Sequence, residues 1–484
     1  MNACANIYGY MRFGKDGAAT MNLKEKMQFH AADAALGQIL KYIDKDPIGN
    51  LTKLVNVSEK LAGSTFPKVN FEKFRQALST PGHVWVEYAL SIIRDTDRDA
   101  LQKAIMAMGY GTYVATKTVR ENREKHRCNF PNIILFDPTS ACNRKCKGCW
   151  SADYGHKYSL TMAEMESIVA QGRELGAHLY MLTGGEPLLR KDDIFKLCEA
   201  NPDCMFLCYT NATLVDDAFC AEMNRLGNLT LALSIEGTAE SNDARRGEGS
   251  YETTVRAMEL LQKRRCFFGI SVCYTSQNID FVTSDAFLDD MLAKGAKFGL
   301  YFNYMPVGQN AVPELVPSPA QREYMYRWLR KIRNAETGKP MFVMDFQNDA
   351  EYVGGCIAGG RNYFHINASG DIEPCVFIHY SDSNIRTHTL LEALQRPLFQ
   401  AYYHNQPFND NHLRPCPMLE NPDCLRHIIA ETGAASTDIL SPESVETLCA
   451  RCDRFAAAWA PEAERLWREF DHPQTKTYYY RDTI

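Results

Sequence analysis

Residues 140–151 read SACNRKCKGCWS, which places Cys142, Cys146 and Cys149 at offsets of four and three. The same stretch holds an asparagine, a glycine and three basic residues. Thiols spaced this closely can form a disulfide, hold a zinc ion or hold an iron–sulfur cluster. The remainder of the sequence provides the evidence for choosing among these three.

The composition is that of a globular protein. The chain has 484 residues, of which 45% are hydrophobic and 23% are charged, and its length suggests roughly three domains. The net charge of −6 is spread without long runs of one sign, so no basic surface for nucleic acid is predicted. No apolar run approaches the ~18 residues that span a membrane, and the N-terminus lacks the apolar segment of a secretory signal.

Cysteine usage indicates the redox compartment. The sequence contains 17 cysteines, an odd number, without a secretory signal. This pattern favours reduced thiols, some of them metal ligands, and a cytoplasmic location. Residues 1–21 are interpreted as a leader without fixed structure, and Met21 offers an alternative start to Met1.

The periodicity of apolar residues divides the rest of the chain. Residues 22–130 show the three-to-four spacing of amphipathic helices and are predicted to form a helical domain. Residues 131–338 alternate short apolar runs with amphipathic segments, which predicts an α/β fold with parallel strands covered by helices. Six such units predict a partial (β/α)6 TIM-like barrel. The predicted strands lie within 132–138, 178–187, 205–213, 229–237, 267–275 and 298–308.

A third region begins near residue 339. Residues 362–380 have the pattern of a hairpin turning at Ser369-Gly370-Asp371. Cysteines recur through residues 339–455, which are predicted to form a small separate domain, and residues 456–484 are predicted to form a C-terminal helix and tail.

The position of the cysteine triplet favours a metal cluster. It directly follows the first predicted strand, and in such folds the functional face lies at the carboxyl ends of the strands. Structural zinc takes four ligands, whereas the nearest further thiol, Cys128, precedes the strand. Three thiolates suit a [4Fe–4S] cluster with one iron left for another ligand.

Further motifs follow the triplet in order, and together they resemble the radical S-adenosylmethionine (radical SAM) superfamily. GGEP at 184–187 ends the second strand, TNAT and SIEG end the third and fourth, and RRG and MPVG follow. In that superfamily, the triplet binds a [4Fe–4S] cluster whose fourth iron is chelated by S-adenosylmethionine. The resemblance implies cofactor-binding roles for Gly184, Gly185, Glu186, Pro187, Asn211, Ser234, Glu236, Arg246, Met305 and Val307.

The sequence departs from the family pattern at two positions. Ala212 stands where similar proteins carry glycine, and Gly148 stands where they carry an aromatic residue that contacts adenine. Trp150, just beyond the triplet, either leans over the cofactor or covers the cluster. The sequence leaves both alternatives open.

The C-terminal cysteines resemble the SPASM or twitch extension, which binds auxiliary [4Fe–4S] clusters. A full SPASM domain has seven cysteines for two clusters; six occur here, and the central C-x2-C-x5-C-x3-C element is absent. The resemblance therefore implies one auxiliary cluster, held by Cys356, Cys375 and Cys416. Cys424 is the nearest candidate for its fourth ligand, and Cys449 and Cys452 are the alternatives; a zinc site stays open.

The remaining polar candidates are interpreted as structural. His365 and His379 flank the hairpin and are expected to be satisfied within the fold. Six thiols on strands and helices are expected to act as small buried hydrophobes: Cys198, Cys204, Cys208, Cys220, Cys266 and Cys273.

The resemblance implies a radical SAM oxidoreductase that cleaves S-adenosylmethionine reductively to a 5′-deoxyadenosyl radical. That radical would abstract hydrogen from a peptide, lipid or small-molecule substrate, with flavodoxin or ferredoxin as electron donor. The alternatives are an iron–sulfur electron carrier or scaffold without radical chemistry and a zinc-binding interaction protein. The sequence shows no cobalamin-binding domain.

Overall fold

The computed structural model describes residues 23–62 and 70–470 of the chain. Its N-terminal part is helical, as the sequence predicts, and these helices share a core that includes Leu36, Ile93 and Leu101. The interpreted leader, residues 1–21, lies outside the described residues. The helices are α1 (Leu23–Tyr42), α2 (Pro47–Ala62), α3 (Phe71–Ser79), α4 (Val84–Asp95) and α5 (Arg98–His126).

The centre of the molecule is a sheet whose six middle strands run parallel in chain order. Each strand pairs with the next, and their buried faces form the largest hydrophobic core. The strands are β1 (Ile133–Thr139), β2 (Leu179–Gly184), β3 (Met205–Thr210), β4 (Leu229–Ser234), β5 (Phe268–Tyr274) and β6 (Phe298–Asn303). The partial TIM-like barrel predicted from the sequence is confirmed.

Helices follow the strands, and two of them begin at capping boxes. Thr161 and Ser318 each form a capping box, with Glu164 and Gln321 respectively, so two orphan backbone donors are satisfied at each start. The helices of this region are α6 (Met162–Leu175), α7 (Lys191–Ala200), α8 (Asp217–Leu226), α9 (Ala239–Arg246), α10 (Ser250–Lys263), α11 (Ile279–Val282), α12 (Asp285–Ala293) and α13 (Pro319–Ile332).

Three further strands extend the sheet at its two edges. β7 (Phe342–Asp345) pairs parallel with β6, and β8 (Tyr363–Ile366) pairs parallel with β1. β9 (Ile372–Glu373) then pairs antiparallel with β8, which forms the predicted hairpin. The sheet is therefore nine strands wide and includes residues from beyond position 338.

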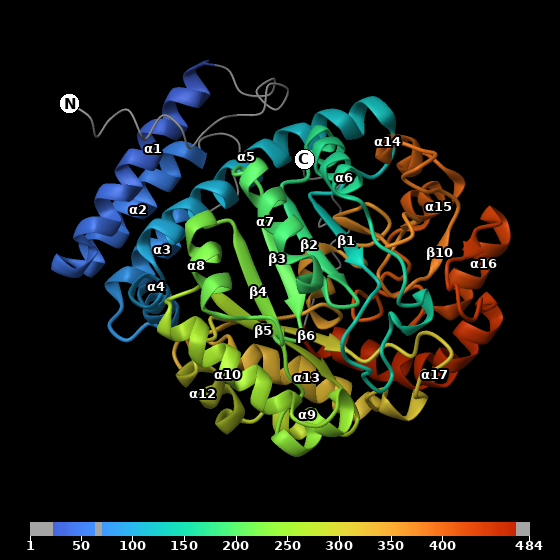
Figure 1. Ribbon diagram of the computed structural model, residues 1–484. Coiled ribbons are helices and arrows are strands. Elements are labelled where there is room, and N and C mark those ends of the chain that lie inside the picture. Colours follow the sequence, from blue (N-terminus) through green and yellow to red (C-terminus); the bar gives the residue numbers. More distant parts are fainter. Residues whose placement is uncertain (1–22, 63–69, 471–484) are drawn as a thin grey trace.

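The C-terminal part packs against the β1 side of the sheet and, in Figure 1, lies on the side opposite the N-terminal helices. Its last helix spans the predicted boundary at 455, and the sheet spans the one at 338, so the domain limits stay predictions. Its elements are α14 (Leu390–Leu394), α15 (Pro397–Asn405), α16 (Pro422–Thr432), α17 (Val445–Glu469), β10 (Tyr380–Ser381) and β11 (Ala435–Ser436).

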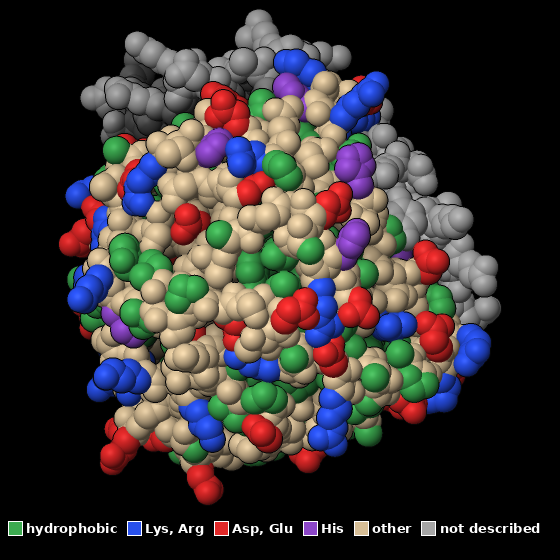
Figure 2. Space-filling view, turned by 90° about the vertical axis from the view of Figure 1, so that its right-hand side faces the viewer, with side chains coloured by type: hydrophobic (Ala, Val, Ile, Leu, Met, Phe, Trp, Pro, Cys, Tyr) green, Lys and Arg blue, Asp and Glu red, His purple; other side chains and the backbone are tan. Residues whose placement is uncertain are grey.

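The surface carries charges of both signs. On the face shown in Figure 2, acidic and basic side chains are interspersed, with apolar side chains between them. Among the described helices, none is both long and apolar enough to cross a membrane.

A buried ion pair joins α13 to the C-terminal part. Arg322 and Glu420 are both fully buried, with Arg322 Nη2 3.3 Å from Glu420 Oε1, and the Arg322 guanidinium also lies 5.6 Å from the ring centre of Trp459. Removing one member of such a pair leaves a buried charge without compensation.

We therefore expect Glu420→Gln to lower the free energy of unfolding by about 3 kcal/mol, measured by denaturant titration. The matched control is Arg327→Gln, because Arg327 is 41% exposed in its pairs with Glu323 and Glu469; its loss should stay below about 1 kcal/mol. Equal losses in the two variants would contradict this interpretation.

Candidate functional site

One cavity of about 720 Å³ opens at the carboxyl ends of the barrel strands. Its lining includes residues from β1 to β6, from the cysteine loop and from the C-terminal part. Six cysteines that the sequence singled out lie on its wall: Cys142, Cys146, Cys149, Cys356, Cys375 and Cys416. The fold thus brings the two cysteine groups to the same space.

The first three cysteines lie in the loop that follows β1. Backbone contacts order the loop: the Lys147 N–H donates to the Arg245 carbonyl at 2.8 Å, and the Ala152 N–H donates to the Cys149 carbonyl at 3.3 Å. All three thiols are partly exposed. Burial raises the pKa of Cys142 to about 11 and also raises that of Cys146. A bound metal would offset this by stabilising the thiolates.

The spacing of these sulfurs does not suit zinc. A tetrahedral zinc ion with Zn–S bonds of about 2.3 Å holds its sulfurs about 3.8 Å apart. Within residues 23–62 and 70–470, neither cysteine triplet has all its sulfurs within 4.8 Å of one another. Both triplets are therefore more open than a mononuclear zinc site.

The GGEP turn packs directly on the start of the cysteine loop. The Gly185 N–H donates to the Thr139 carbonyl at 3.0 Å, and the Glu186 N–H donates to the Ala141 carbonyl at 2.8 Å. A Cβ atom on Gly185 would lie 2.1 Å from the Ala141 carbonyl oxygen. Glycine is therefore required for the end of β2 to approach the loop this closely.

The Glu186 carboxylate is held by the neighbouring strand end. It accepts hydrogen bonds from Thr210 Oγ1 at 2.7 Å, the Asn211 N–H at 2.8 Å and the Leu188 N–H at 3.0 Å. Burial raises its pKa. These bonds involve both carboxylate oxygens, so the Glu186 carboxylate links the GGEP turn after β2 to the end of β3 at the cavity wall. Its contact with the amino group of a cofactor stays a prediction.

Glu236 anchors two arginines at the cavity. Its Oε1 accepts hydrogen bonds from Arg245 Nη1 at 2.5 Å and from Arg246 Nε at 2.7 Å, while Glu236 itself is 1% exposed. The sequence analysis assigned a cofactor-binding role to Arg246; both Arg245 and Arg246 line the cavity.

Most of the predicted cofactor-binding residues lie on the cavity wall. Those lining it are Gly184, Gly185, Glu186, Asn211, Ser234, Arg246 and Met305. Pro187, Glu236 and Val307 lie behind the wall and are buried, so their predicted roles remain untested.

The second cysteine group has backbone and side-chain donors at its sulfurs. The hydroxyl of Tyr363 lies 2.8 Å from Cys375 Sγ, and the Met418 and Leu419 N–H groups donate to Cys416 Sγ at 3.4 Å. Burial raises the pKa of Cys375 to about 11 and that of Cys356 to about 12. Such donors stabilise sulfur that carries negative charge, as in a metal-bound thiolate.

The residues that line the cavity do not identify a fourth cysteine ligand for the second cysteine group. Cys424 is partly exposed but does not line the cavity, and Cys449 and Cys452 are fully buried on α17. Their roles as ligands stay predictions.

The structure corrects the sequence interpretation of one thiol. Cys273, expected to be a buried hydrophobe, is partly exposed and lines the cavity on β5. The other five thiols of that set are buried, as expected. Sequence reasoning also missed Tyr209, Phe302 and Phe346 on the cavity wall. Alternation of facing residues along a strand is the signal that could have identified them.

Trp150 lies toward the C-terminal part. Its ring centre is 6.2 Å from that of Phe377, 6.1 Å from Tyr154, 6.0 Å from His379 and 5.9 Å from His365. Trp150 also lines the cavity beside Cys149, and so packs between the two cysteine groups.

Beneath Trp150 lies a buried charged network. His365 Nε2 is 2.9 Å from Asp137 Oδ1, and His365 Nδ1 is 2.6 Å from Glu373 Oε2. The Tyr154 hydroxyl donates to the same Glu373 carboxylate at 2.7 Å. His379 is held by Asp438 at 2.7 Å. Both histidines are satisfied within the fold, as the sequence interpretation expected.

The network predicts a pH-dependent contribution to stability. Burial alone lowers the pKa of His365, but the charge of Asp137 and the hydrogen bonds to Asp137 and Glu373 outweigh it and raise that pKa to about 10. Because this value exceeds the ~6.5 of an unfolded chain, the stabilisation is fully present below about pH 6.5 and is lost as pH rises through about 10.

The difference in unfolding temperature between the wild type and His365→Gln should therefore be largest near pH 6 and shrink toward pH 10. Differential scanning calorimetry at several pH values measures it. His427→Gln is the control, since the His427 side chain is 76% exposed. A difference that does not vary with pH would mean that His365 is uncharged in the folded protein.

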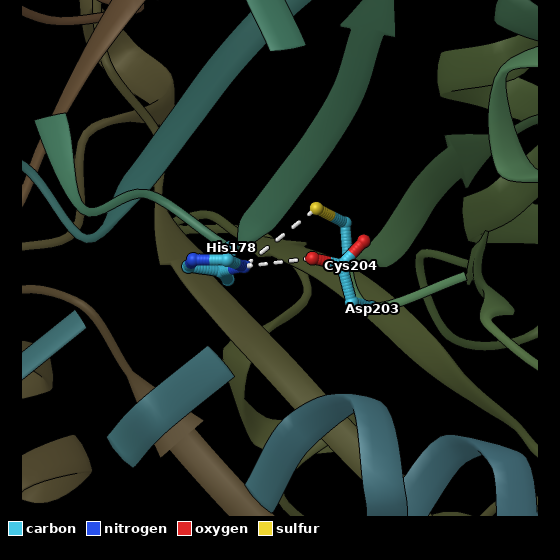
Figure 3. A group of neighbouring side chains, drawn as sticks. All are labelled: His178, Asp203 and Cys204. Carbon is cyan, nitrogen blue, oxygen red and sulfur yellow. Dashed lines mark hydrogen bonds and ion pairs between the residues drawn. The ribbon is translucent and has the colours of Figure 1, made fainter. Parts of the chain in front are cut away.

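Among the described residues, one further group of metal-type ligands lies at the opposite ends of β2 and β3. His178, Asp203 and Cys204 have ligand atoms within 4.8 Å of one another (Figure 3). However, Arg173 Nη2 lies 2.7 Å from the Asp203 carboxylate, and burial lowers the pKa of His178 to about 4. The arginine already neutralises the carboxylate, so we interpret this group as a structural contact of a neutral histidine.

The sequence profile described as the Radical SAM superfamily matches residues 136–288, the span that contains the cysteine triplet and the GGEP turn. Residues 136–288 of this chain are therefore a radical SAM domain. Members of this superfamily use a [4Fe–4S] cluster and S-adenosylmethionine.

Two curated relatives each match about half of the chain. An AdoMet-dependent heme synthase of Methanosarcina barkeri is 27% identical over 285 residues, covering 53% of this chain and 80% of the relative. The mycofactocin maturase MftC of Mycolicibacterium smegmatis is 27% identical over 259 residues, covering 51% and 64%.

The fold is also similar to that of a solved structure. SuiB of Streptococcus suis, crystallised with its precursor peptide SuiA, superposes with a TM-score of 0.53 at 18% identity. The match covers 71% of this chain and 81% of SuiB.

Proposed function

We propose that this protein is a radical SAM oxidoreductase with two iron–sulfur sites that face one substrate cavity. The observation that carries the proposal is the presence of both cysteine triplets on the wall of a single cavity, inside and beside the radical SAM domain. The substrate enters between the two sites.

Cys142, Cys146 and Cys149 would hold the first [4Fe–4S] cluster. Three ligands leave one iron without a protein ligand, where S-adenosylmethionine would bind. The cluster and this cofactor together supply one-electron cleavage of a sulfonium C–S bond, which starts hydrogen abstraction from substrate. The GGEP turn, Asn211, Ser234 and the two arginines held by Glu236 would orient the cofactor.

Cys356, Cys375 and Cys416 would hold one auxiliary [4Fe–4S] cluster in a SPASM or twitch-like region. The donors from Tyr363, Met418 and Leu419 support this role, because they would stabilise metal-bound thiolates. Cys424 is the proposed fourth ligand, with Cys449 and Cys452 as alternatives.

Part of the cavity wall is apolar. It is built from Met181 and Tyr209 of the barrel, Phe302 and Phe346 at its far edge, and Phe377 of the C-terminal part. The stacked rings of Phe302 and Phe346, 4.5 Å apart, would exclude water from a reacting carbon. This wall favours an apolar or aromatic group at the reacting position of the substrate.

The comparisons suggest two kinds of substrate. The names of the relatives point to heme formation and mycofactocin maturation, and the solved neighbour was crystallised with a peptide. We propose a peptide or a small molecule, with a lipid as the alternative, reduction by flavodoxin or ferredoxin, and a cytoplasmic location where the thiols stay reduced.

Iron analysis of protein reconstituted without oxygen tests the two sites. Cys146→Ala should lose about half of the bound iron, and so should Cys375→Ala, because each substitution removes one of two [4Fe–4S] clusters. Cys375→Ala should keep the spectroscopic response of the first cluster to S-adenosylmethionine, and Cys146→Ala should lose it. Cys220→Ala, a buried thiol away from the cavity, is the control. Zinc without iron in the wild type would favour the zinc-binding alternative.

Product analysis tests the radical chemistry. Reconstituted wild type with dithionite should convert S-adenosylmethionine to 5′-deoxyadenosine, and Cys146→Ala should form none above background. Chromatography with mass detection measures the product. A fully loaded wild type that forms no 5′-deoxyadenosine would instead favour the electron carrier or scaffold.

A further inference from the structure

Two glycines mediate a reciprocal contact between the cysteine loop and the segment that follows β6. A Cβ atom on Gly148 of the loop would lie 2.5 Å from the Tyr304 hydroxyl oxygen. A Cβ atom on Gly308 of the segment would lie 2.4 Å from Asp153 Oδ2. Each partner thus provides a glycine against which a side chain of the other packs.

Tyr304 forms the first of these contacts and is rigidly held. It is 1% exposed, its N–H donates to the Tyr274 carbonyl at 3.0 Å, and its hydroxyl accepts from the Val312 N–H at 2.9 Å. The ring also lines the cavity beside Gly148. Tyr304 therefore provides an aromatic wall next to position 148 from outside the loop.

Asp153 forms the second contact. It is 3% exposed, and its Oδ2 accepts from the Gln309 N–H at 2.6 Å. Cys149 lies between the two contacts along the chain. The loop from Gly148 to Asp153 is thus gripped on both sides of its third cysteine.

Hydrogen bonds from the C-terminal part also hold both sides of this contact. The Asp153 carbonyl accepts from the Ile439 N–H at 2.9 Å and from the Leu440 N–H at 3.0 Å. Arg451 Nη1 of α17 donates to the Pro306 carbonyl at 3.3 Å. Both halves of the contact are therefore tied to the region that carries the second cysteine group.

We propose that residues 304–312 act as a clamp that sets the position of Cys149, with Tyr304 and Asp153 as its positioning residues. The inference rests on the proposed function, in which Cys149 is a cluster ligand. In resembling proteins an aromatic side chain comes from the position before the third cysteine; here the ring comes from the end of β6 and the loop provides glycine. The placement of the third thiolate then depends on Tyr304.

A double-mutant cycle on Gly148 and Tyr304 tests the contact. The readouts are the dissociation constant of S-adenosylmethionine and the change it causes in the electron paramagnetic resonance spectrum of the reduced, reconstituted protein. Gly148→Ala forces a methyl group against the Tyr304 hydroxyl and should weaken binding at least about tenfold. Tyr304→Ala releases the loop and should also weaken binding, about tenfold. The double variant should bind S-adenosylmethionine more tightly than multiplying the two single-variant losses in affinity predicts, because removing the Tyr304 ring makes room for the methyl group at position 148.

If the alanine variants incorporate little iron–sulfur cluster, a more conservative pair of variants still tests the proposal. Tyr304→Phe retains the ring but loses the Val312 contact, and it should alter the cofactor-induced spectral change. Tyr301→Phe is the matched control: Tyr301 is a fully buried β6 tyrosine whose hydroxyl donates to the Val282 carbonyl at 2.7 Å. It should change the unfolding temperature and leave the spectrum as in the wild type.

The outcomes separate the clamp from the proposed function. A wild type with no iron at the first triplet, or no spectral response to S-adenosylmethionine, overturns the proposed function and the clamp with it. A responsive wild type with strictly additive losses, or Tyr304→Phe indistinguishable from Tyr301→Phe, overturns the clamp alone. Coupled losses together with the altered spectrum support it.

Discussion

The parallel pairing of β8 with β1 is the constraint on which the rest of this structure depends. Ile133 to Phe136 of β1 align with Tyr363 to Ile366 of β8, so the hairpin formed by β8 and β9 continues the barrel sheet beyond β1. The register aligns Tyr363 with Ile133 at the start of β1. Tyr363 and Cys375 nevertheless line the same cavity as the first cysteine loop.

The charged network under Trp150 reinforces that pairing. Asp137 comes from β1, His365 from β8 and Glu373 from β9, so one imidazole ring on β8 joins two carboxylates from the strands on either side of it. Burying such a set is favourable only when each member is paired, which makes the alignment of the three strands specific. The glycine contacts at 185 and 148 then fix the loop against this base. Both cysteine sites thus take their positions from a few close backbone approaches and one buried network.

Much of this arrangement was predictable from local sequence. The alternation of apolar runs and amphipathic helices gave the six parallel strands, and capping residues such as Thr161 and Ser318 marked helix starts. The triplet at the end of the first strand and GGEP at the end of the second located the cavity. These features depend on neighbouring residues, which is why periodicity and turn chemistry reveal them.

The features that sequence did not reveal arise from contacts between distant residues. His365 and Asp137 are 228 residues apart in the chain, and no local sequence pattern predicts that their strands will pair. The short β7 and β9 lack a clear period, and Cys273 resembles its buried neighbours in composition although its strand turns it inward. The orientation of Trp150 depends on the C-terminal part that it contacts.

The position of β8 also determines whether the edge of β1 is exposed. A strand at the rim of a parallel sheet presents a row of backbone donors and acceptors that invites association with other chains. β8 and β9 cover that rim of β1, so the C-terminal region shields the barrel from aggregation as well as carrying thiols. A barrel without β8 would expose the hydrogen-bonding edge of β1.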